Sequence, residues 1–216
     1  MEKFKVLLAD DHAIIRDGLK QILADTDDLE VVGEAANGVE VLQQVRQKKW
    51  DVLVLDISMP GRNGLDLIHL VKVEQPGLPI LILSMHHEEQ YAVRALHAGA
   101  SGYITKESDS DLLVAAIRRV ASGGVHISDK VAELMVRGMR PSGEALPHTV
   151  LSDREFQIFN MLVSGLGLTE IGAELSLSVK TISTHKTHIL QKMNMTNTAE
   201  LIRYAIAHEL AEPSKF

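Results

Sequence analysis

Short apolar runs rich in β-branched residues alternate with amphipathic stretches over the first 120 residues, and this alternation constrains the fold most strongly. The runs span residues 6–9, 30–33, 52–55, 80–83 and 102–105. The stretches between and after them place apolar residues at helical spacing. Strands that alternate with helices of this length predict a parallel sheet covered on both faces. Five such units predict a doubly wound α/β domain with the strand order 2-1-3-4-5.

Charged or polar residues stand where four of these predicted strands end. Asp10 and Asp11 follow the first strand, Asp56 the third, Ser84 the fourth and Lys106 the fifth. In such sheets ligands bind beyond the carboxyl ends of the strands, near the switch point between strands 1 and 3. Two carboxylates about 4 Å apart repel each other by roughly 4 kcal/mol at an effective dielectric constant near 20. The sequence therefore predicts an acidic site that needs a cation, and a set of oxygen ligands suits Mg²⁺.

Each of these residues alone also has an ordinary explanation. An aspartate at a strand end is often a helix cap or a turn former, and Asp11 could cap the next helix. Lys106 alone would be a solvated surface lysine. Their joint placement at successive strand ends favours a functional site instead. The histidines and glutamates at 86–89 do not predict a metal site, because adjacent side chains diverge on either a strand or a helix.

Four motifs in this part of the chain carry a family resemblance. LLADDH, LVLDISMPGRNGLDL, ILSMH and GASGYITKES resemble the receiver domain of bacterial response regulators, over about residues 4–122. The resemblance implies that Asp56 accepts a phosphoryl group from a histidine kinase. It also implies a regulator rather than an enzyme, with at most slow autodephosphorylation tuned by Ser58 and His86.

The same resemblance assigns roles to the other strand-end residues. Mg²⁺ would be held by Asp11, Asp56 and the backbone carbonyl of Ser58, with Asp10 supporting through water. Lys106 would pair with the phosphoryl oxygens. Ser84 and Tyr103 would form the switch pair that repacks one face of the domain.

The rest of the chain predicts a linker and a helical domain. Residues 1–124 form the predicted receiver, and residues 125–148 form a linker with a short helix at 129–139. Residues 149–216 predict four helices, with capping boxes that begin at Ser152 and Asn197. A break at 175–178 separates a short helix from a longer one, which is the helix-turn-helix pattern.

The longer of these two helices has one apolar and one polar face on a helical wheel. Ile182, Ile189 and Met193 cluster on the apolar side. The polar side predicts a DNA-binding surface made of Lys180, Thr181, Ser183, Thr184, Thr187, His188 and Gln191. The alternative is a small helical bundle whose polar face is only solvated.

This last part resembles the LuxR-type output domain, and with the receiver the whole chain resembles a NarL/FixJ-family response regulator. The resemblance implies binding to double-stranded DNA as a homodimer through the last helix. That helix offers four apolar residues, namely Leu201, Ile202, Ala205 and Ile206. The motif GLGLTEIG departs from the family, because Leu168 and Thr169 stand where a polar phosphate contact is common.

Composition and charge bear on the binding partner and on the cellular compartment. Residues 1–124 carry 13 Lys and Arg against 19 Asp and Glu (net −6), and residues 149–216 carry 6 against 7 (net −1), so global charge does not indicate nucleic-acid binding. The absence of cysteine, the short apolar stretches and the lack of a signal-peptide pattern predict a cytoplasmic protein without a membrane span. Two rival functions remain open, a magnesium-dependent phosphohydrolase with Asp56 as nucleophile, and a phosphorylation-gated protein-interaction module.

Overall fold

The structure, a computed structural model, describes residues 3–59, 64–85, 88–138, 146–208 and 210. The chain divides into two compact units, Met1–Arg140 and Pro141–Phe216. Within the described residues, no helix has both the length and the apolar character needed to cross a bilayer.

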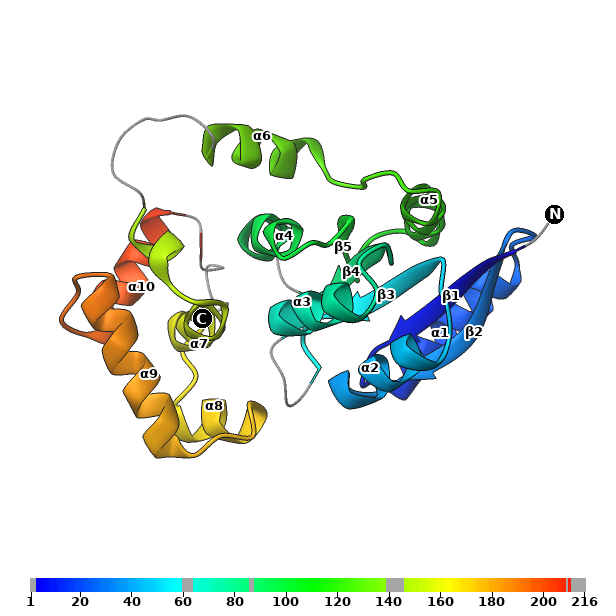
Figure 1. The fold of residues 1–216 in the computed structure, drawn as a ribbon. Helices are drawn as coiled ribbons and strands as arrows, with labels where there is room; N and C mark the ends of the chain where they lie inside the picture. The colour runs from blue at the N-terminus through cyan, green and yellow to red at the C-terminus, as the bar shows by residue number, and fades with distance from the viewer. Residues whose placement is uncertain (1–2, 60–63, 86–87, 139–145, 209, 211–216) are drawn as a thin grey trace. The chain divides into compact units, whose positions relative to one another are not determined.

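A five-stranded parallel sheet forms the centre of the first unit (Figure 1). Its order is β2-β1-β3-β4-β5, which confirms the predicted order. The strands are β1 (Phe4–Ala9), β2 (Leu29–Ala35), β3 (Val52–Asp56), β4 (Ile80–Ser84) and β5 (Gly102–Thr105). Every residue of β3 and β4 is buried, which explains why these strands are almost entirely apolar in sequence.

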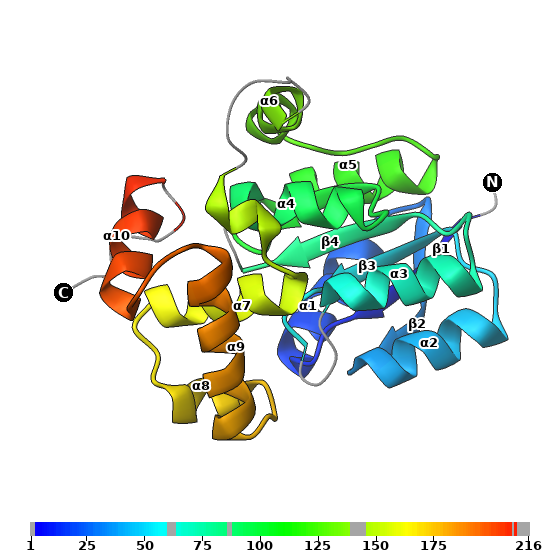
Figure 2. The same cartoon turned by 60° about the vertical axis from the view of Figure 1, so that its left-hand side comes forward.

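Helices cover both faces of the sheet (Figures 1 and 2). On one face, α1 (Ala13–Ala24) and α5 (Ser110–Ala121) pack on the core and on each other. On the other face, α3 (Gly64–Glu74) lies between α2 (Gly38–Gln47) and α4 (Glu88–His97). This is the predicted doubly wound arrangement, and it places the carboxyl ends of β1 and β3 side by side.

The single tryptophan of the chain lies just before β3, away from the strand's carboxyl end. Trp50 is 6% exposed, and its indole N–H donates to the carbonyl of Gln44 at 3.1 Å. A Cβ added at Gly33 would come within 2.3 Å of the indole ring, so only glycine leaves room for this side chain beside β2.

The segment after α5 belongs to the first unit. It forms a parallel bridge between His126 and Gly102 of β5 and continues into α6 (Asp129–Gly138), which packs against α4. Val131 of α6 is fully buried. The predicted helix is therefore present over residues 129–138, while residue 139 lies outside the described residues. Residues 125–138, which the sequence assigned to a linker, pack with the sheet domain.

The second unit is helical. It contains a short 3₁₀ helix, η1 (Pro147–Val150), and then α7 (Asp153–Val163), α8 (Leu168–Glu174), α9 (Val179–Lys192) and α10 (Thr198–Ala207). The break between α8 and α9 falls at residues 175–178, as predicted. α9 packs against both α7 and α8, and its predicted apolar residues are buried, namely Ile182, Ile189 and Met193.

Side-chain caps fix where the helices of this unit begin. Ser152 and Glu155 form the predicted reciprocal capping box at α7. At α10 the side chain of Asn197 accepts from the N–H of Glu200, but the Glu200 carboxylate accepts from the N–H of Thr196 instead of Asn197. The predicted second capping box is therefore only half present, because the glutamate bonds to the residue before the N-cap and not to the N-cap itself.

Candidate functional site

The predicted acidic residues converge at the carboxyl ends of β1 and β3. Asp10, Asp11, His12 and Asp56 each place one potential ligand atom within 4.8 Å of the others. Asp10 is 2% exposed and Asp56 is 1% exposed, so two carboxylates lie almost out of contact with water. The paired strands β1 and β3 bring them together, although they are 46 residues apart in sequence.

Lys106 joins the two buried carboxylates. Its ammonium nitrogen lies 2.6 Å from Oδ2 of Asp10 and 2.6 Å from Oδ2 of Asp56. Its backbone N–H donates to the carbonyl of Ser84 at 2.8 Å, which ties the end of β5 to the end of β4. Burial alone would lower the pKa of Lys106, but hydrogen bonds to the two aspartates outweigh it and raise that pKa. The amine therefore stays charged.

Asp56 keeps an elevated pKa despite these partners. Burial raises the pKa of its carboxyl, while Lys106 and the N–H of Ser58, which donates to Oδ1 at 2.8 Å, act in the opposite direction. A desolvated carboxylate with few partners is held at higher free energy than one in water, so it responds to any added positive charge.

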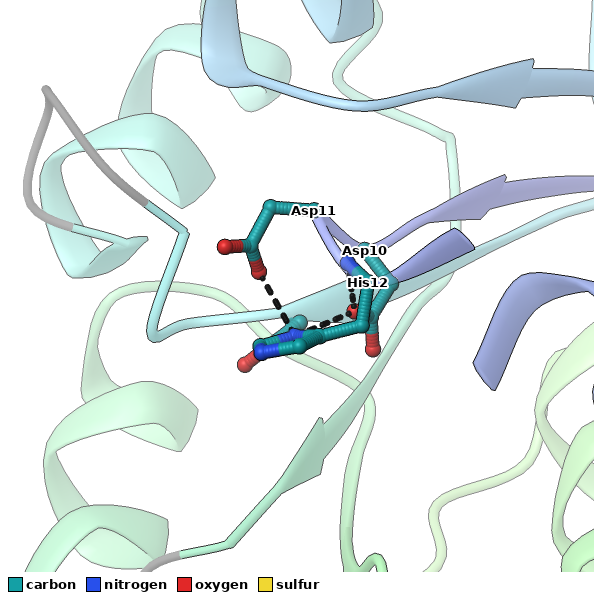
Figure 3. A group of neighbouring side chains, drawn as sticks. Asp10, Asp11 and His12 are labelled. Carbon is teal, nitrogen blue, oxygen red and sulfur yellow. Dashed lines mark hydrogen bonds and ion pairs between the residues drawn. The ribbon is translucent and has the colours of Figure 1, made fainter. Parts of the chain in front are cut away.

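His12 turns back toward the two aspartates that precede it (Figure 3). Its backbone N–H donates to Oδ1 of Asp10 at 2.8 Å, and its ring Nδ1 lies 3.1 Å from Oδ1 of Asp10 and 3.1 Å from Oδ1 of Asp11. The N-cap of α1 is His12, so Asp11 is not the cap that the sequence allowed. Sequence reasoning missed His12, and the only available signal was its position directly after the acidic pair.

Arg16 holds the loop between β1 and α1 in place. Its Nη1 donates to the carbonyl of Asp10 at 2.6 Å, and its Nε donates to Glu34 on β2 at 3.2 Å. Because Asp10 is fixed through its own backbone, its carboxylate is directed at Lys106 before any ligand arrives. The sequence did not single out this arginine.

The donor set fits a divalent cation. Three carboxylates supply oxygen ligands of the kind that Mg²⁺ prefers. Oδ1 of Asp11 is buried and has no hydrogen-bond partner beyond its 3.1 Å contact with the His12 ring, so it offers an acceptor that a cation would satisfy. Ser58 is placed by its N–H bond to Asp56, and the ligand role of its carbonyl stays a prediction.

The predicted switch residues lie inside the first unit. Ser84 is fully buried at the end of β4, and Tyr103 is 1% exposed on the neighbouring strand β5. The structure thus places both on adjacent strands, while their role as a switch pair stays a prediction. His86 lies outside the described residues, as do the side chains of residues 87–89.

The predicted DNA-binding face of α9 lies on the surface of the second unit. Thr181 is half-buried, and the other six residues are exposed, namely Lys180, Ser183, Thr184, Thr187, His188 and Gln191. The hydroxyl of Thr184 donates to the carbonyl of Lys180 at 3.0 Å, and that of Thr187 donates to Ser183 at 3.1 Å. These bonds orient the two threonine oxygens as acceptors toward the solvent.

The last helix departs from one expectation. Leu201 and Ala205 are fully buried in the second unit itself, because α10 packs against α7. They are therefore not available to a partner, contrary to the sequence prediction. Ile206 is 60% exposed and Ile202 is half-buried, so any surface contact through α10 would involve these two.

Family comparisons agree with both units. The response regulator receiver domain matches residues 6–118, and the luxR family of bacterial regulatory proteins matches residues 149–205. The oxygen regulatory protein NreC of Staphylococcus carnosus is 40% identical over 215 residues, which covers 96% of this chain and 99% of that protein.

Two solved structures of a response regulator match this chain over nearly its whole length. The response regulator RcsB of Salmonella typhimurium has a TM-score of 0.69 at 26% identity, over 96% of this chain and 98% of that one. RcsB of Salmonella enterica serovar Typhimurium, bound to the promoter P1flhDC in the presence of phosphomimetic BeF₃⁻, has a TM-score of 0.66 at 26% identity. This match covers 95% of this chain and 100% of that one.

Proposed function

Since the chain belongs to the NarL/FixJ family of response regulators, which join a receiver domain to a LuxR-type DNA-binding domain, we propose that phosphorylation of Asp56 controls its binding to DNA. The observation that carries this proposal is the single lysine, Lys106, held at 2.6 Å from both buried aspartates. Lys106 thus places one ammonium group beside the carboxylate that an anionic phosphoryl group must approach.

In the proposed reaction one carboxylate oxygen of Asp56 attacks the phosphorus of a phosphohistidine on a sensor kinase. The new O–P bond forms as the N–P bond breaks, and the kinase imidazole leaves as a neutral ring after taking up a proton. The main barrier is the repulsion between the carboxylate and the phosphoryl oxygens. The ammonium of Lys106 reduces it, because it lies on the Oδ2 side of Asp56 and can follow the transferred group.

We assign Mg²⁺ to the same site, held by Asp11, Asp56 and the carbonyl of Ser58, with Asp10 supporting through water. When bound, the ion would supply further positive charge next to the phosphoryl oxygens. Asp56 contributes an oxygen that is already desolvated, and Asp11 contributes its buried Oδ1, which the His12 ring contacts at 3.1 Å.

The switch that follows would use Ser84 and Tyr103. The hydroxyl of Ser84, at the end of the strand next to Asp56, would donate to a phosphoryl oxygen, and the Tyr103 ring would repack beside it. Moving from a largely inactive to a largely active population needs about 5.5 kcal/mol of differential stabilisation. Several charge-assisted hydrogen bonds to one new phosphoryl group can supply much of it.

The output would be DNA binding by α9 in a homodimer. The helix and its cap carry three lysines and no acidic residue over residues 178–193, although the unit as a whole is nearly neutral. Each neutralised DNA phosphate contributes about −0.9 to the slope of the logarithm of the binding constant against the logarithm of the salt concentration. A few such contacts therefore give only weak binding for one copy of the protein. Two copies on adjacent half-sites would bind far more tightly. Without a predicted membrane span, the cytoplasm is the compartment in which we place this regulator.

The test uses the full chain, a small-molecule phosphodonor and MgCl₂. Intact mass spectrometry should show the addition of one phosphoryl group, and the phosphorylated chain should select a defined sequence from random duplexes. Asp56→Asn should lose both results, while Asp66→Asn, an exposed aspartate on α3, should keep them. Uptake of one phosphoryl group by Asp56→Asn would overturn the assignment of the acceptor.

The two rival functions give different results in the same assays. Sustained hydrolysis of phosphate esters at many turnovers per chain would favour a phosphohydrolase. Phosphorylation without binding to any duplex at low salt would favour a module that binds a protein partner.

A further inference from the structure

His12 adds a nitrogen ligand to a site that otherwise offers only oxygen. Its ring Nδ1 belongs to the same group of atoms as the three carboxylates, all within 4.8 Å of one another. The ring does not cap α1, since the N-cap residue makes no side-chain capping bond, and it is directed at Asp10 and Asp11 instead (Figure 3). The imidazole thus faces the position where a cation would bind.

The spacing of these atoms suits a first-row transition metal. Such ions bind imidazole nitrogen and carboxylate oxygen at roughly 2.0–2.2 Å, so two ligands on opposite sides of one ion lie roughly 4.4 Å apart and the others lie closer together. All four atoms already lie within 4.8 Å of one another, so the group is close to the size of one coordination shell and would contract around the ion. The side chain of His12 is 62% exposed, so its ring can make this movement without disturbing the core.

The chemistry of the ligands predicts selectivity. Mg²⁺ prefers oxygen, keeps several waters and gains little from an imidazole. Nickel and zinc ions bind imidazole readily and also accept carboxylates. We propose that His12, together with Asp10, Asp11 and Asp56, makes this site prefer a nitrogen-binding dication such as Ni²⁺ or Zn²⁺ over Mg²⁺.

This inference rests on the proposed metal site and adds a second class of ion to it. Mg²⁺ would still bind through the carboxylates. A transition metal, even at a much lower concentration, would compete for the same aspartates and would occupy oxygens that Lys106 now pairs with. The composition of the divalent-ion pool would then affect the state of the receiver.

The test is isothermal titration calorimetry of the full chain with NiCl₂ and, separately, with MgCl₂. His12→Ala should lower the ratio of the Ni²⁺ affinity to the Mg²⁺ affinity by about tenfold or more, since loss of a residue that supports a metal site costs at least that much. The Mg²⁺ affinity itself should change by less than about twofold. His69→Ala removes an exposed histidine of α3 and serves as the matched control, with no expected change in the ratio.

A second variant separates the possible outcomes. Asp11→Ala should weaken binding of both ions, and amide NMR signals of residues 10–13 should broaden first as Ni²⁺ is added to the wild type. An unchanged Ni²⁺:Mg²⁺ ratio in His12→Ala, or full Ni²⁺ affinity in Asp11→Ala, would overturn the inference. Absence of Mg²⁺ binding in the wild type would instead contradict the proposed magnesium site, so the two failures are distinguishable.

Discussion

The backbone N–H of Tyr103 donates a hydrogen bond of 3.1 Å to the carbonyl of His126, and the N–H of His126 donates to Ser101 at 3.0 Å. The strand that carries the proposed switch tyrosine is therefore bonded directly to the segment that leads into α6. A displacement of β5 would be transmitted to α6 through backbone bonds, without any side-chain relay. This pairing would carry the effect of the proposed phosphorylation from the sheet to α6.

The pairing depends on Gly102. A Cβ added there would lie 2.8 Å from the carbonyl oxygen of His126 and 3.0 Å from Leu81, so Gly102→Ala should push the segment off the strand. We expect a loss of about 1–3 kcal/mol in unfolding free energy and faster hydrogen exchange at the amide of His126. Gly18→Ala adds the same methyl group to α1 where nothing lies within 4 Å, and it should leave that amide protected. Equal protection in both variants would contradict this account.

Lys106→Met should destabilise the first unit strongly. The substitution leaves two buried carboxylates, Asp10 and Asp56, without the cation that pairs with both. Breaking a buried ion pair on one side typically costs about 3–5 kcal/mol, which urea unfolding of the full chain followed by circular dichroism would measure. Adding Asp56→Asn to Lys106→Met should restore part of the loss by removing one charge. If Lys106→Met alone were as stable as the wild type, the ion pairs of Lys106 would contribute nothing to stability.

Glu155→Gln should make the stability of α7 less dependent on pH. Burial would raise the pKa of Glu155, but Lys192 at 2.6 Å and two bonds from Ser152 outweigh it and lower that pKa below its usual 4.5. The carboxylate's contribution is therefore complete above about pH 4.5 and is lost as the pH falls through the lowered value.

The measurement for Glu155 is hydrogen exchange of the first turn of α7. At pH 7 the glutamine variant should lose up to about 1 kcal/mol of protection, because it can still close the capping box but loses the ion pair with Lys192. The difference from the wild type should shrink as the pH drops below 4.5. A difference that stays constant with pH would exclude the carboxylate as its source.

Thr184 should read a base that presents an amino donor, because its own proton is committed to Lys180. Thr184→Val keeps the shape and the methyl group but removes the acceptor, and it should relax the preference for cytosine or adenine at one position of the selected duplex. Thr184→Ser keeps the hydroxyl and should retain the preference. Identical selected sequences for the valine variant and the wild type would show that this oxygen reads no base.

Ile206→Lys should weaken DNA binding by impairing dimer formation while preserving the fold. Ile206 is 60% exposed, so the substitution removes no core packing, unlike any change at the fully buried Leu201. We expect loss of cooperative binding to paired half-sites in a gel-shift titration. Val73→Lys on α3, at a residue 77% exposed, provides the matched control. Unchanged cooperativity would place the dimer contact elsewhere.

The sequence predicted the sheet and the acidic site well because both depend on local patterns. Buried parallel strands are continuous apolar runs, and residues that follow them gather at one edge whatever the helices contain, which is why Asp10, Asp56 and Lys106 meet as expected. The prediction that Leu201 and Ala205 face a partner was wrong. A helical wheel shows that Leu201 and Ala205 share a face, but it does not show that α7 covers it.

Two other features had no pattern to reveal them. The bridge from His126 to Gly102 is a single isolated pair, too short to produce the alternation that marks a strand. His12 reaches its neighbours because the loop before α1 curls back on itself, and adjacent residues are normally expected to point apart.

Trp50 packs against Gly33 at the amino end of β3, so the chain's tryptophan fluorescence is specific to one unit. Tryptophan emission will therefore change when the sheet domain unfolds and will stay constant when only the helical domain unfolds. The two units can therefore be followed separately in one sample, by comparing tryptophan emission with a signal that both share.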